Sequence, residues 1–254
     1  MNFKDLKKLH QRKYREQFRC FLAEGEHLID ELKKAALRHS VLRNSEVYVT
    51  RRHEHWSGPF PKTLISEKQM SQLSETKSPQ GIVARVPCFS PVMISQANVH
   101  TGIPPPQRAV YLYAVQDPGN LGSILRSLAW FGSFRCLLSP GSVDPYHAKV
   151  IRASMGSIFH VPIEVDVPLD SLARRFGKIA CLDLKGECLT APSFKDCDCY
   201  LFGNEARGIP RGRLDALNPR QFCIGGSGTI DSLNLAAAVN MSVYELSREP
   251  AKSV

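Results

Sequence analysis

Apolar and polar residues follow a regular rhythm in the second part of the chain. Short apolar runs predict strands at Ala109–Val115, Arg135–Leu138, Val161–Val165, Ile179–Leu182, Tyr200–Phe202 and Phe222–Ile224. Helical spacing occupies most intervals, at Leu121–Phe131, Ala148–Ser154, Ser171–Phe176, Arg211–Leu217 and, after the last strand, Ser232–Leu246. Apolar strands that alternate with helices are typical of a mainly parallel sheet covered on both faces.

The first part of the chain has a weaker pattern that still predicts a small α/β unit. Its expected strands are Glu46–Thr50 and Ile82–Val86. Helical spacing fills the second half of Phe18–Ala36, and a further helix over Ser66–Leu73 has Ser66 as its N-cap. No internal repeat or low-complexity tract interrupts either part.

A stretch rich in Pro, Gly and polar residues, Phe89–Gln107, separates the two patterns. Such composition is typical of a linker or an extended crossover. We therefore expect a first domain over residues 1–90, a linker over 91–107 and a second domain over 108–254.

The composition of the 254 residues is that of a globular protein, with 43% hydrophobic and 22% charged residues. No apolar run in the chain approaches the roughly 20 residues of a membrane helix. Met1–Phe18 carries many Lys and Arg residues and has no apolar core of a secretory signal. These features argue against a membrane or secreted protein.

Eight cysteines are scattered along the chain without any C-x-x-C spacing. The single close pair, Cys197 and Cys199, lacks the second pair that a zinc site requires, so no metal is expected. Several of these cysteines lie inside apolar runs. Reduced, buried thiols in a cytoplasmic protein are the expected interpretation.

The net charge of +9 is concentrated near the start of the chain. Residues 1–95 hold 17 Lys and Arg against 10 Asp and Glu, a balance of +7, whereas residues 96–254 hold 16 against 14, a balance of +2. This asymmetry indicates a polyanionic partner such as nucleic acid, or simply a solvated basic surface. The basic residues proposed to contact RNA phosphates are Lys8, Arg12, Lys13, Arg15 and Arg19.

Three loops are unusual at places where parallel sheets bind ligands, after the carboxyl ends of strands. The first, Gln116–Gly122, contains Asn120 as a candidate helix cap, and Arg126 follows nearly two turns later. The two side chains face one site in the functional interpretation. In the structural interpretation the loop is only a turn and a cap, followed by a solvated arginine.

The second loop, Gly203–Pro210, brings Gly203, Asn204 and Glu205 to the end of an apolar strand. Glycine there allows close approach of a ligand to the main chain, but an ordinary strand-to-helix turn has the same composition. Its two glycines have the spacing of a P-loop. Ile209 and Pro210 replace the Lys and Ser or Thr of that motif, so a P-loop is excluded.

The third loop follows Ile224 and has three glycines among four residues, Gly225–Gly228. Ser232 or Asp231 is expected to cap the last helix. A polar Ser-x-Asn pair, Ser232 and Asn234, at the start of an apolar helix indicates a polar neighbour. The glycines do not form the fingerprint of dinucleotide-binding domains.

Taken together and in this order, the three motifs resemble those of the SpoU (TrmH) family of RNA 2′-O-ribose methyltransferases. The matching stretches are Asn120–Arg126, Phe202–Gly208 and Asp231–Leu235, with an R-x-S-x-G segment at Arg152–Gly156. The first domain is similar to the substrate-binding domain often joined to this enzyme, at Arg12–Arg15 and Phe21–Gly25. The resemblance extends from about residue 8 to 248.

This resemblance implies a SPOUT fold: a parallel sheet with a C-terminal trefoil knot, preceded by a small α/β RNA-binding domain. It also implies S-adenosylmethionine as cofactor and a homodimer whose active site uses both chains. The implied cofactor contacts are Gly203, Asn204, Ile224 and Leu233. The implied catalytic residues are Asn120, Arg126, Glu205, Ser232 and Asn234. The family often has Ile-Pro-Met where this chain has Ile224-Gly225-Gly226.

The expected reaction is methyl transfer from S-adenosylmethionine to a ribose 2′-hydroxyl, with ribosomal RNA favoured over tRNA. Arg126 would act as the base or as an electrostatic stabiliser of the developing alkoxide. Stabilisation is favoured because free arginine, with a pKa above about 12, is a poor base at pH 7. Two alternatives are a non-catalytic RNA-binding protein with the same fold and a nucleotide-dependent oxidoreductase. The first would not need the five implied catalytic residues that this chain has. The second would need the glycine fingerprint of dinucleotide-binding domains, which this chain lacks.

Overall fold

The computed structural model describes residues 1–89 and 108–248, so the predicted linker at 91–107 and the final residues 249–254 lie outside the described residues. The described chain divides into two compact units. Unit 1 contains residues 1–89 together with 144–160, and unit 2 contains residues 108–143 together with 161–248.

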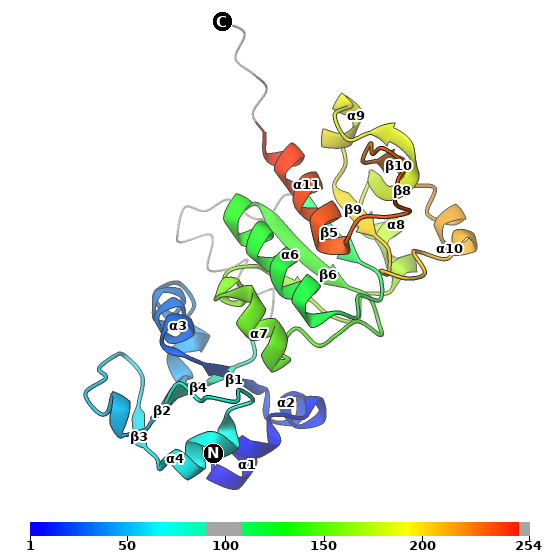
Figure 1. Cartoon of the computed structure of the whole chain (residues 1–254). Coiled ribbons are helices and arrows are strands. Elements are labelled where there is room, and N and C mark those ends of the chain that lie inside the picture. Colours follow the sequence, from blue (N-terminus) through cyan, green and yellow to red (C-terminus); the bar gives the residue numbers. More distant parts are fainter. Residues whose placement is uncertain (90–107, 249–254) are drawn as a thin grey trace, which may run out of the picture. The chain divides into compact units, whose positions relative to one another are not determined.

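Unit 1 is built around a four-stranded mixed sheet in the order β1-β4-β2-β3 (Figure 1). The strands are β1 (Cys20–Glu24), β2 (Glu46–Val49), β3 (Lys62–Leu64) and β4 (Ile82–Pro87). β4 pairs antiparallel with β1 and β2, and β3 pairs parallel with β2. The helices are α1 (Phe3–Lys8), α2 (Arg12–Phe18), α3 (Glu26–Arg38), α4 (Glu67–Leu73) and α7 (Ala148–Ser154), with short 3-10 turns at Ser40–Asn44, Arg51–His53 and Ser157–Phe159.

Local sequence explains most of unit 1. The apolar face of α3, predicted from its helical spacing, is buried against the sheet, and α4 begins with the expected cap. Ser66 accepts from the Gln69 N–H while the Gln69 side chain accepts from the Ser66 N–H, a complete capping box. Strands β1 and β3 were not predicted, because five and three residues of mixed polarity give too short a pattern.

Residues 144–160 pack within unit 1 although they follow a strand of unit 2 in the sequence. The rings of Phe21 on β1 and Tyr146 are stacked with centroids 4.7 Å apart, and Phe159 lies 6.4 Å from Phe21 on the same cluster. Asp144 forms an ion pair with Arg15 of α2. These contacts join the segment 144–160 to β1 and α2.

Unit 2 is a six-stranded parallel sheet in the order β10-β8-β9-β5-β6-β7, which confirms the predicted sheet class. The strands are β5 (Arg108–Leu112), β6 (Phe134–Leu138), β7 (Ile163–Glu164), β8 (Ile179–Cys188), β9 (Cys199–Phe202) and β10 (Arg220–Cys223). The helices are α6 (Pro118–Phe131), α8 (Leu172–Arg175), α9 (Pro192–Lys195), α10 (Arg211–Asp215) and α11 (Leu235–Ser247), with a 3-10 turn at Leu169–Ser171.

Buried aromatic side chains fix the sheet of unit 2. Tyr111 of β5 is fully buried, and its hydroxyl donates to the carbonyl of Val167 at 3.0 Å. Phe194 lies edge-on to both Tyr200 and Phe222, each with ring centroids 5.0 Å apart. The long helices α6 and α11 lie side by side in this unit (Figure 1).

The structure corrects two boundaries in unit 2. The strand expected at Ala109–Val115 ends at Leu112, because Ala114 adopts a left-handed φ of 49° and turns the chain away from the sheet. The helix expected from Ser232 begins at Leu235. Within the described ranges no helix is long and apolar enough to span a membrane.

Candidate active site

The first and second motif loops follow two neighbouring strands of unit 2. β5 and β9 pair in parallel, with Leu112 opposite Phe202 at their carboxyl ends. The loop that leads into α6 and the loop that begins at Gly203 therefore leave the sheet at the same edge. This is the position at which open parallel sheets bind ligands.

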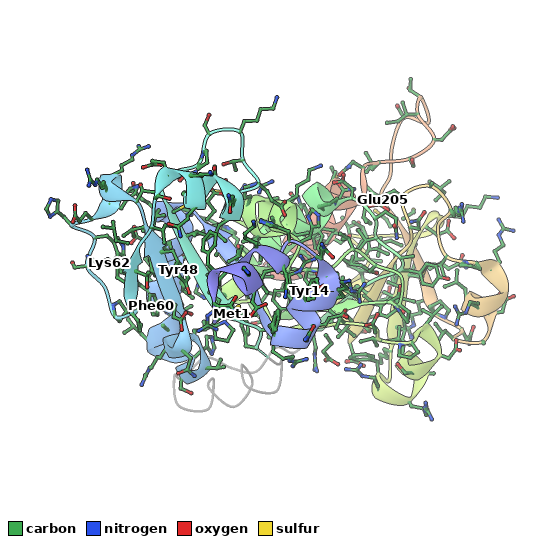
Figure 2. The ribbon with its side chains drawn as sticks, turned by 90° about the horizontal axis from the view of Figure 1, so that it is seen from below. Met1, Tyr14, Tyr48, Phe60, Lys62 and Glu205 are labelled. Carbon is green, nitrogen blue, oxygen red and sulfur yellow. The ribbon has the colours of Figure 1, made fainter. Side chains whose placement is uncertain are left out.

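Three polar side chains from the three motifs form a continuous hydrogen-bonded chain at this edge. Asn120 Nδ2 donates to Glu205 Oε1 at 3.1 Å, and Asn234 Nδ2 donates to Asn120 Oδ1 at 2.9 Å. The main-chain N–H of Gln116 donates to the other carboxylate oxygen of Glu205 at 3.4 Å. Figure 2 labels Glu205, whose carboxylate is the acceptor at the end of this chain. The three motifs thus converge on one polar surface.

Asp117, and not Asn120, caps helix α6, which corrects the sequence prediction. The Asp117 carboxylate accepts from the Asn120 N–H at 2.8 Å, and Pro118 occupies the first helical position. Because Asp117 satisfies the helix end, the Asn120 amide group is available for Glu205 and Asn234. Asp before Pro at a helix start was the sequence signal for this cap.

Internal bonds hold the second loop in shape. The side-chain Oδ1 of Asn204 accepts from the main-chain N–H groups of Ala206 and Arg207, and its Nδ2 donates to the Ala114 carbonyl at 2.7 Å. Asn204 and Gly208 also bond to each other through their main chains. Most of the bonding capacity of the Asn204 side chain is therefore used inside the protein, where it fixes the position of Glu205.

Local geometry explains why glycine occupies both positions 203 and 208 of this loop. A Cβ atom on Gly203 would lie 2.7 Å from the Cα of Gly208 and 3.0 Å from the nitrogen of Ile209. Gly208 has a φ of 61°, in the left-handed region that favours glycine. Gly203 is thus required by the close return of its own loop.

The third motif contributes Asn234 as the N-cap of α11. Its Oδ1 accepts from the Ala237 N–H at 3.2 Å while its Nδ2 reaches Asn120. The expected caps, Ser232 and Asp231, are wrong: both are exposed and lie before the helix. Asn234, directly before the apolar run that begins at Leu235, was the better cap candidate, and it links the helix start to the polar chain.

The segment before Asn234 has free main-chain groups. Within the described part of the chain, residues 224–233 make no main-chain to main-chain hydrogen bond, although the Thr229 N–H donates to the Ser227 hydroxyl at 3.3 Å. Space is open around Gly225 and Gly226, and Ile224 and Leu233 present partly exposed apolar surface. Unpaired N–H and C=O groups beside apolar side chains suit a nucleoside such as the adenosine of the predicted cofactor.

A single copy of the chain does not bring the predicted catalytic residue Arg126 to this polar surface. Six residues beyond Asn120 on α6, it lies about 9 Å along the axis and is rotated by about 120°. Its side chain is exposed, with no hydrogen bond or ion pair to any residue that the structure describes. Arg126 shares its exposed stripe of α6 with Trp130, four residues on, which is 84% exposed.

Unit 1 holds the predicted RNA-binding residues on or near α1 and α2. Lys8 is paired with Asp5 at 2.8 Å, and Arg12 with Glu16 at 2.7 Å. The ammonium groups of Lys8 and Lys13 lie 5.5 Å and 4.7 Å from the ring centre of Tyr14. Arg12, Lys13 and Arg19 are exposed.

Arg15 differs from the other members of that basic set, because it is buried. Its Nε donates to Asp144 at 2.8 Å, and its Nη1 donates to the carbonyls of Leu9 and His10 at 2.7 and 2.9 Å. Only 5% of its side chain is exposed. The guanidinium is thus bound inside unit 1 and offers little surface to a phosphate.

Arg152, from the R-x-S-x-G segment, lines a pocket of unit 1 together with Arg15, His10, Glu75 and Tyr146. This segment therefore lies in the unit that does not contain the three motif loops. In the described residues, no three His, Cys, Asp or Glu side chains gather in a way that could hold a metal ion.

Comparison with protein families gives two matches. The model of the SpoU rRNA methylase family matches residues 107–244, and that of the MRM3-like substrate binding domain matches residues 1–84. The chain is 31% identical, over 96% of its length and 94% of the relative, to the 23S rRNA (guanosine(2553)-2′-O)-methyltransferase RlmP of Bacillus subtilis.

Two solved structures have similar folds. One is the S-adenosylmethionine-bound rRNA methyltransferase from Sinorhizobium meliloti, at 26% identity and a TM-score of 0.75 over 96% of this chain and 93% of that one. The other is the SpoU methyltransferase AviRb from Streptomyces viridochromogenes, at 21% identity and a TM-score of 0.77 over 96% of both chains. The second likeness concerns the fold alone.

Proposed function

Because the chain belongs to the SpoU rRNA methylase family, we propose that it transfers a methyl group from S-adenosylmethionine to a ribose 2′-hydroxyl of ribosomal RNA. The observation that carries this proposal is the bonded chain Glu205–Asn120–Asn234, which joins all three motifs at one edge of a parallel sheet. Ribosomal RNA is favoured over tRNA because the B. subtilis relative, similar over nearly the whole chain, is named for 23S rRNA.

The proposed cofactor site consists of Gly203, Ile224 and Leu233, with Asn204 holding the second loop in place. When bound, S-adenosylmethionine supplies a methyl group activated by a positively charged sulfur. The free main-chain groups of residues 224–233 would bind the adenosine by hydrogen bonds, and Ile224 and Leu233 would contact it through apolar surface. The open Gly225-Gly226 pair replaces the family's usual Pro-Met and leaves these groups accessible.

Arg126 is proposed to stabilise the 2′-oxygen as its proton leaves. An arginine side chain keeps its charge at neutral pH, so it acts as a fixed cation for the developing alkoxide. Glu205, Asn120 and Asn234 would orient the ribose, since their bonded chain fixes the direction of each polar group. Ser232, exposed on the same segment, would contact the substrate phosphate or ribose.

We extend the proposal to a homodimer with a shared active site. Trp130 and Phe131 of α6 and Met241 and Tyr244 of α11 form an apolar surface, with Tyr244 57% and Met241 47% exposed. The rings of Phe131 and Tyr244 lie 6.1 Å apart, so the two helices contribute to one continuous patch. A large exposed apolar patch is typical of a protein interface.

Dimerisation on this patch would explain the position of Arg126. Its neighbour on the exposed stripe is Trp130, so the guanidinium would lie at the interface, near a site of the second chain. Changing Trp130 to Glu is expected to give a monomer in sedimentation velocity and to abolish methyl transfer. A stable, active dimer of this variant would contradict the arrangement.

Several finer features remain part of the proposal. The C-terminal trefoil knot of SPOUT domains and the division into domains at 1–90 and 108–254 with a linker at 91–107 are supported by the family matches at 1–84 and 107–244. The exposed Arg12, Lys13 and Arg19, with Lys8, would bind RNA phosphates. A ribosomal substrate favours a cytoplasmic location.

The decisive experiment combines binding and transfer. Purified protein should bind S-adenosylmethionine in calorimetry and transfer a labelled methyl group to ribosomal RNA from cells that lack its gene. Mapping of 2′-O-methyl groups in those cells and in the parent strain should identify one missing position. Cofactor binding without any transfer to ribosomal RNA or tRNA would support a non-catalytic role and overturn the proposal.

A further inference from the structure

Two cysteines lie opposite each other on adjacent strands of unit 2. β8 and β10 pair in parallel, and their register places Cys188 directly beside Cys223. Neighbouring strands are about 4.7–4.9 Å apart. This spacing is within the range of about 4.4–6.8 Å between the Cα atoms of a disulfide.

The two side chains also point to the same face of the sheet. Directly paired residues of parallel strands share a face, and successive residues alternate between faces. Cys223 follows the fully buried Phe222, and Cys188 precedes the buried Leu189. Both thiols therefore point away from the core, with Cys188 exposed and Cys223 half-buried.

The present contacts of the two sulfur atoms are weak ones. The Thr190 hydroxyl donates to the Cys188 sulfur at 3.3 Å, and the Cys223 thiol donates to the Gly186 carbonyl at 3.3 Å. Rotation about χ1 would release both sulfurs. The Leu189 N–H donates to the Cys223 carbonyl at 3.2 Å, so the main chains stay together while the side chains turn.

The remaining six cysteines are poor competitors. Cys20, Cys136, Cys181, Cys197 and Cys199 are buried. Burial raises the pKa of Cys136, of Cys181 and of the half-buried Cys88 to about 12, so these groups stay protonated. The hydrogen bond from Thr190 lowers the pKa of the exposed Cys188 and favours its reactive thiolate.

We propose that Cys188 and Cys223 form a redox-active dithiol, which hydrogen peroxide oxidises to an intramolecular disulfide. The Cys188 thiolate attacks one peroxide oxygen, the O–O bond breaks, and hydroxide leaves as Cys188 becomes a sulfenic acid. The Cys223 sulfur then attacks Cys188, the S–S bond forms, and the S–O bond breaks with release of water. Two electrons pass from the two thiols to the peroxide. A small-molecule dithiol reduces the bond by exchange, so that both cysteine thiols return and the dithiol leaves as its own disulfide.

The disulfide would lie next to the proposed cofactor site. Cys223 immediately precedes Ile224, the first residue of the segment with free main-chain groups. Closure of the bond pulls Cys223 from Gly186 and ties the start of that segment to β8. We expect the oxidised protein to bind S-adenosylmethionine about tenfold more weakly. This consequence rests on the proposed function, whereas the disulfide itself does not.

Peptide mapping of the full-length protein tests the bond directly. After treatment with hydrogen peroxide, alkylation of free thiols and trypsin digestion, residues 186–195 and 221–248 should appear as one cross-linked peptide. Each of these peptides contains a single cysteine, so the link is unambiguous. Dithiothreitol should restore two separate alkylated peptides. Separate alkylated peptides after oxidation, or a link to another cysteine or another chain, would overturn the proposal.

Three variants complete the test. Cys188→Ser and Cys223→Ser should both prevent the cross-link and keep cofactor affinity unchanged by peroxide, whereas Cys88→Ser should behave like the parent protein. A cross-link that forms without any loss of cofactor affinity would support the dithiol and refute its effect on the site. Failure of reduced protein to bind S-adenosylmethionine would contradict only the proposed function, because the cross-link is measured without it.

Discussion

Replacement of Arg15 by methionine is expected to destabilise unit 1, although the residue belongs to the most basic part of the sequence. The guanidinium donates to Asp144 and to the carbonyls of Leu9 and His10. Its partner Asp144 lies 129 residues away in the sequence and begins the segment 144–160 that packs within unit 1. The substitution therefore removes a link between distant parts of the chain.

The structure indicates a large effect. The side chains of Arg15 and Asp144 are only 5% and 13% exposed, so loss of the arginine leaves a mostly buried carboxylate without a cation. Removal of one partner of a buried ion pair typically costs about 3–5 kcal/mol. Two carbonyl oxygens also lose their charged donor. An exposed pair such as Arg12 and Glu16 contributes only about 0–1 kcal/mol.

Urea denaturation can measure this difference in unit 1 alone. The chain has two tryptophans, Trp56 in unit 1 and the highly exposed Trp130 in unit 2, so a Trp130→Phe background makes fluorescence report on unit 1. In that background Arg15→Met should lower the free energy of unfolding by about 3–5 kcal/mol. Arg12→Ala, the matched surface control, should change it by less than about 1 kcal/mol.

A double-mutant cycle separates the ion pair from general packing. Asp144→Asn keeps the oxygen that accepts from the Tyr146 N–H and removes the charge. Once Arg15 is replaced, this second change should cost much less than it does in the parent, because no cation is left to lose. Additive effects within about 0.5 kcal/mol, or a loss below about 1 kcal/mol for Arg15→Met, would refute the assigned role.

Four further variants test the site and the basic surface. Arg126→Ala should reduce methyl transfer by at least about 10²-fold with little change in cofactor affinity, measured by single-turnover kinetics and calorimetry. Gly203→Ala should reduce cofactor binding, because its Cβ would push against Gly208 at 2.7 Å and displace the second loop. Arg12 and Lys13 changed together to Ala should flatten the log–log salt dependence of RNA binding by about 1.4–1.8. Burial lowers the pKa of His39, so the unfolded chain binds its proton more readily and stability should fall as the pH drops below about 6.5; a His39→Leu variant should show a flatter pH dependence of unfolding.

A specific experimental result would contradict each of these predictions. Near-normal turnover of Arg126→Ala would remove that residue from the chemistry. Gly212→Ala, where a Cβ meets open space, is the control for Gly203→Ala, and equal behaviour of the two would exclude a steric role. An unchanged salt slope would place RNA binding elsewhere on the protein. If the free energy of unfolding of the His39→Leu variant depends on pH as the parent's does, protonation of His39 does not destabilise the folded protein.

The sequence alone determined the class of the fold. Apolar runs such as Tyr200–Phe202 are buried on both faces, so their composition indicates parallel strands without any tertiary information. Glycines at 203 and 208 and asparagines at 120 and 234 marked the three loops, and their order along the chain distinguished them from ordinary turns of the same composition. Of the motif residues that the sequence indicated, Asn120, Glu205 and Asn234 meet at the carboxyl edge of the sheet, whereas Arg126 does not reach them.

Only the tertiary structure decided what the individual side chains do. Asn120, Asn204 and Asn234 have the same chemistry, and their partners come from loops up to 114 residues apart, which no local pattern encodes. Arg15 and Arg12 are three residues apart on α2, yet one is buried and the other exposed. The difference arises because Arg15, and not Arg12, lies on the side of α2 that contacts Asp144. The charge pattern of the sequence does not show which of the two arginines is buried.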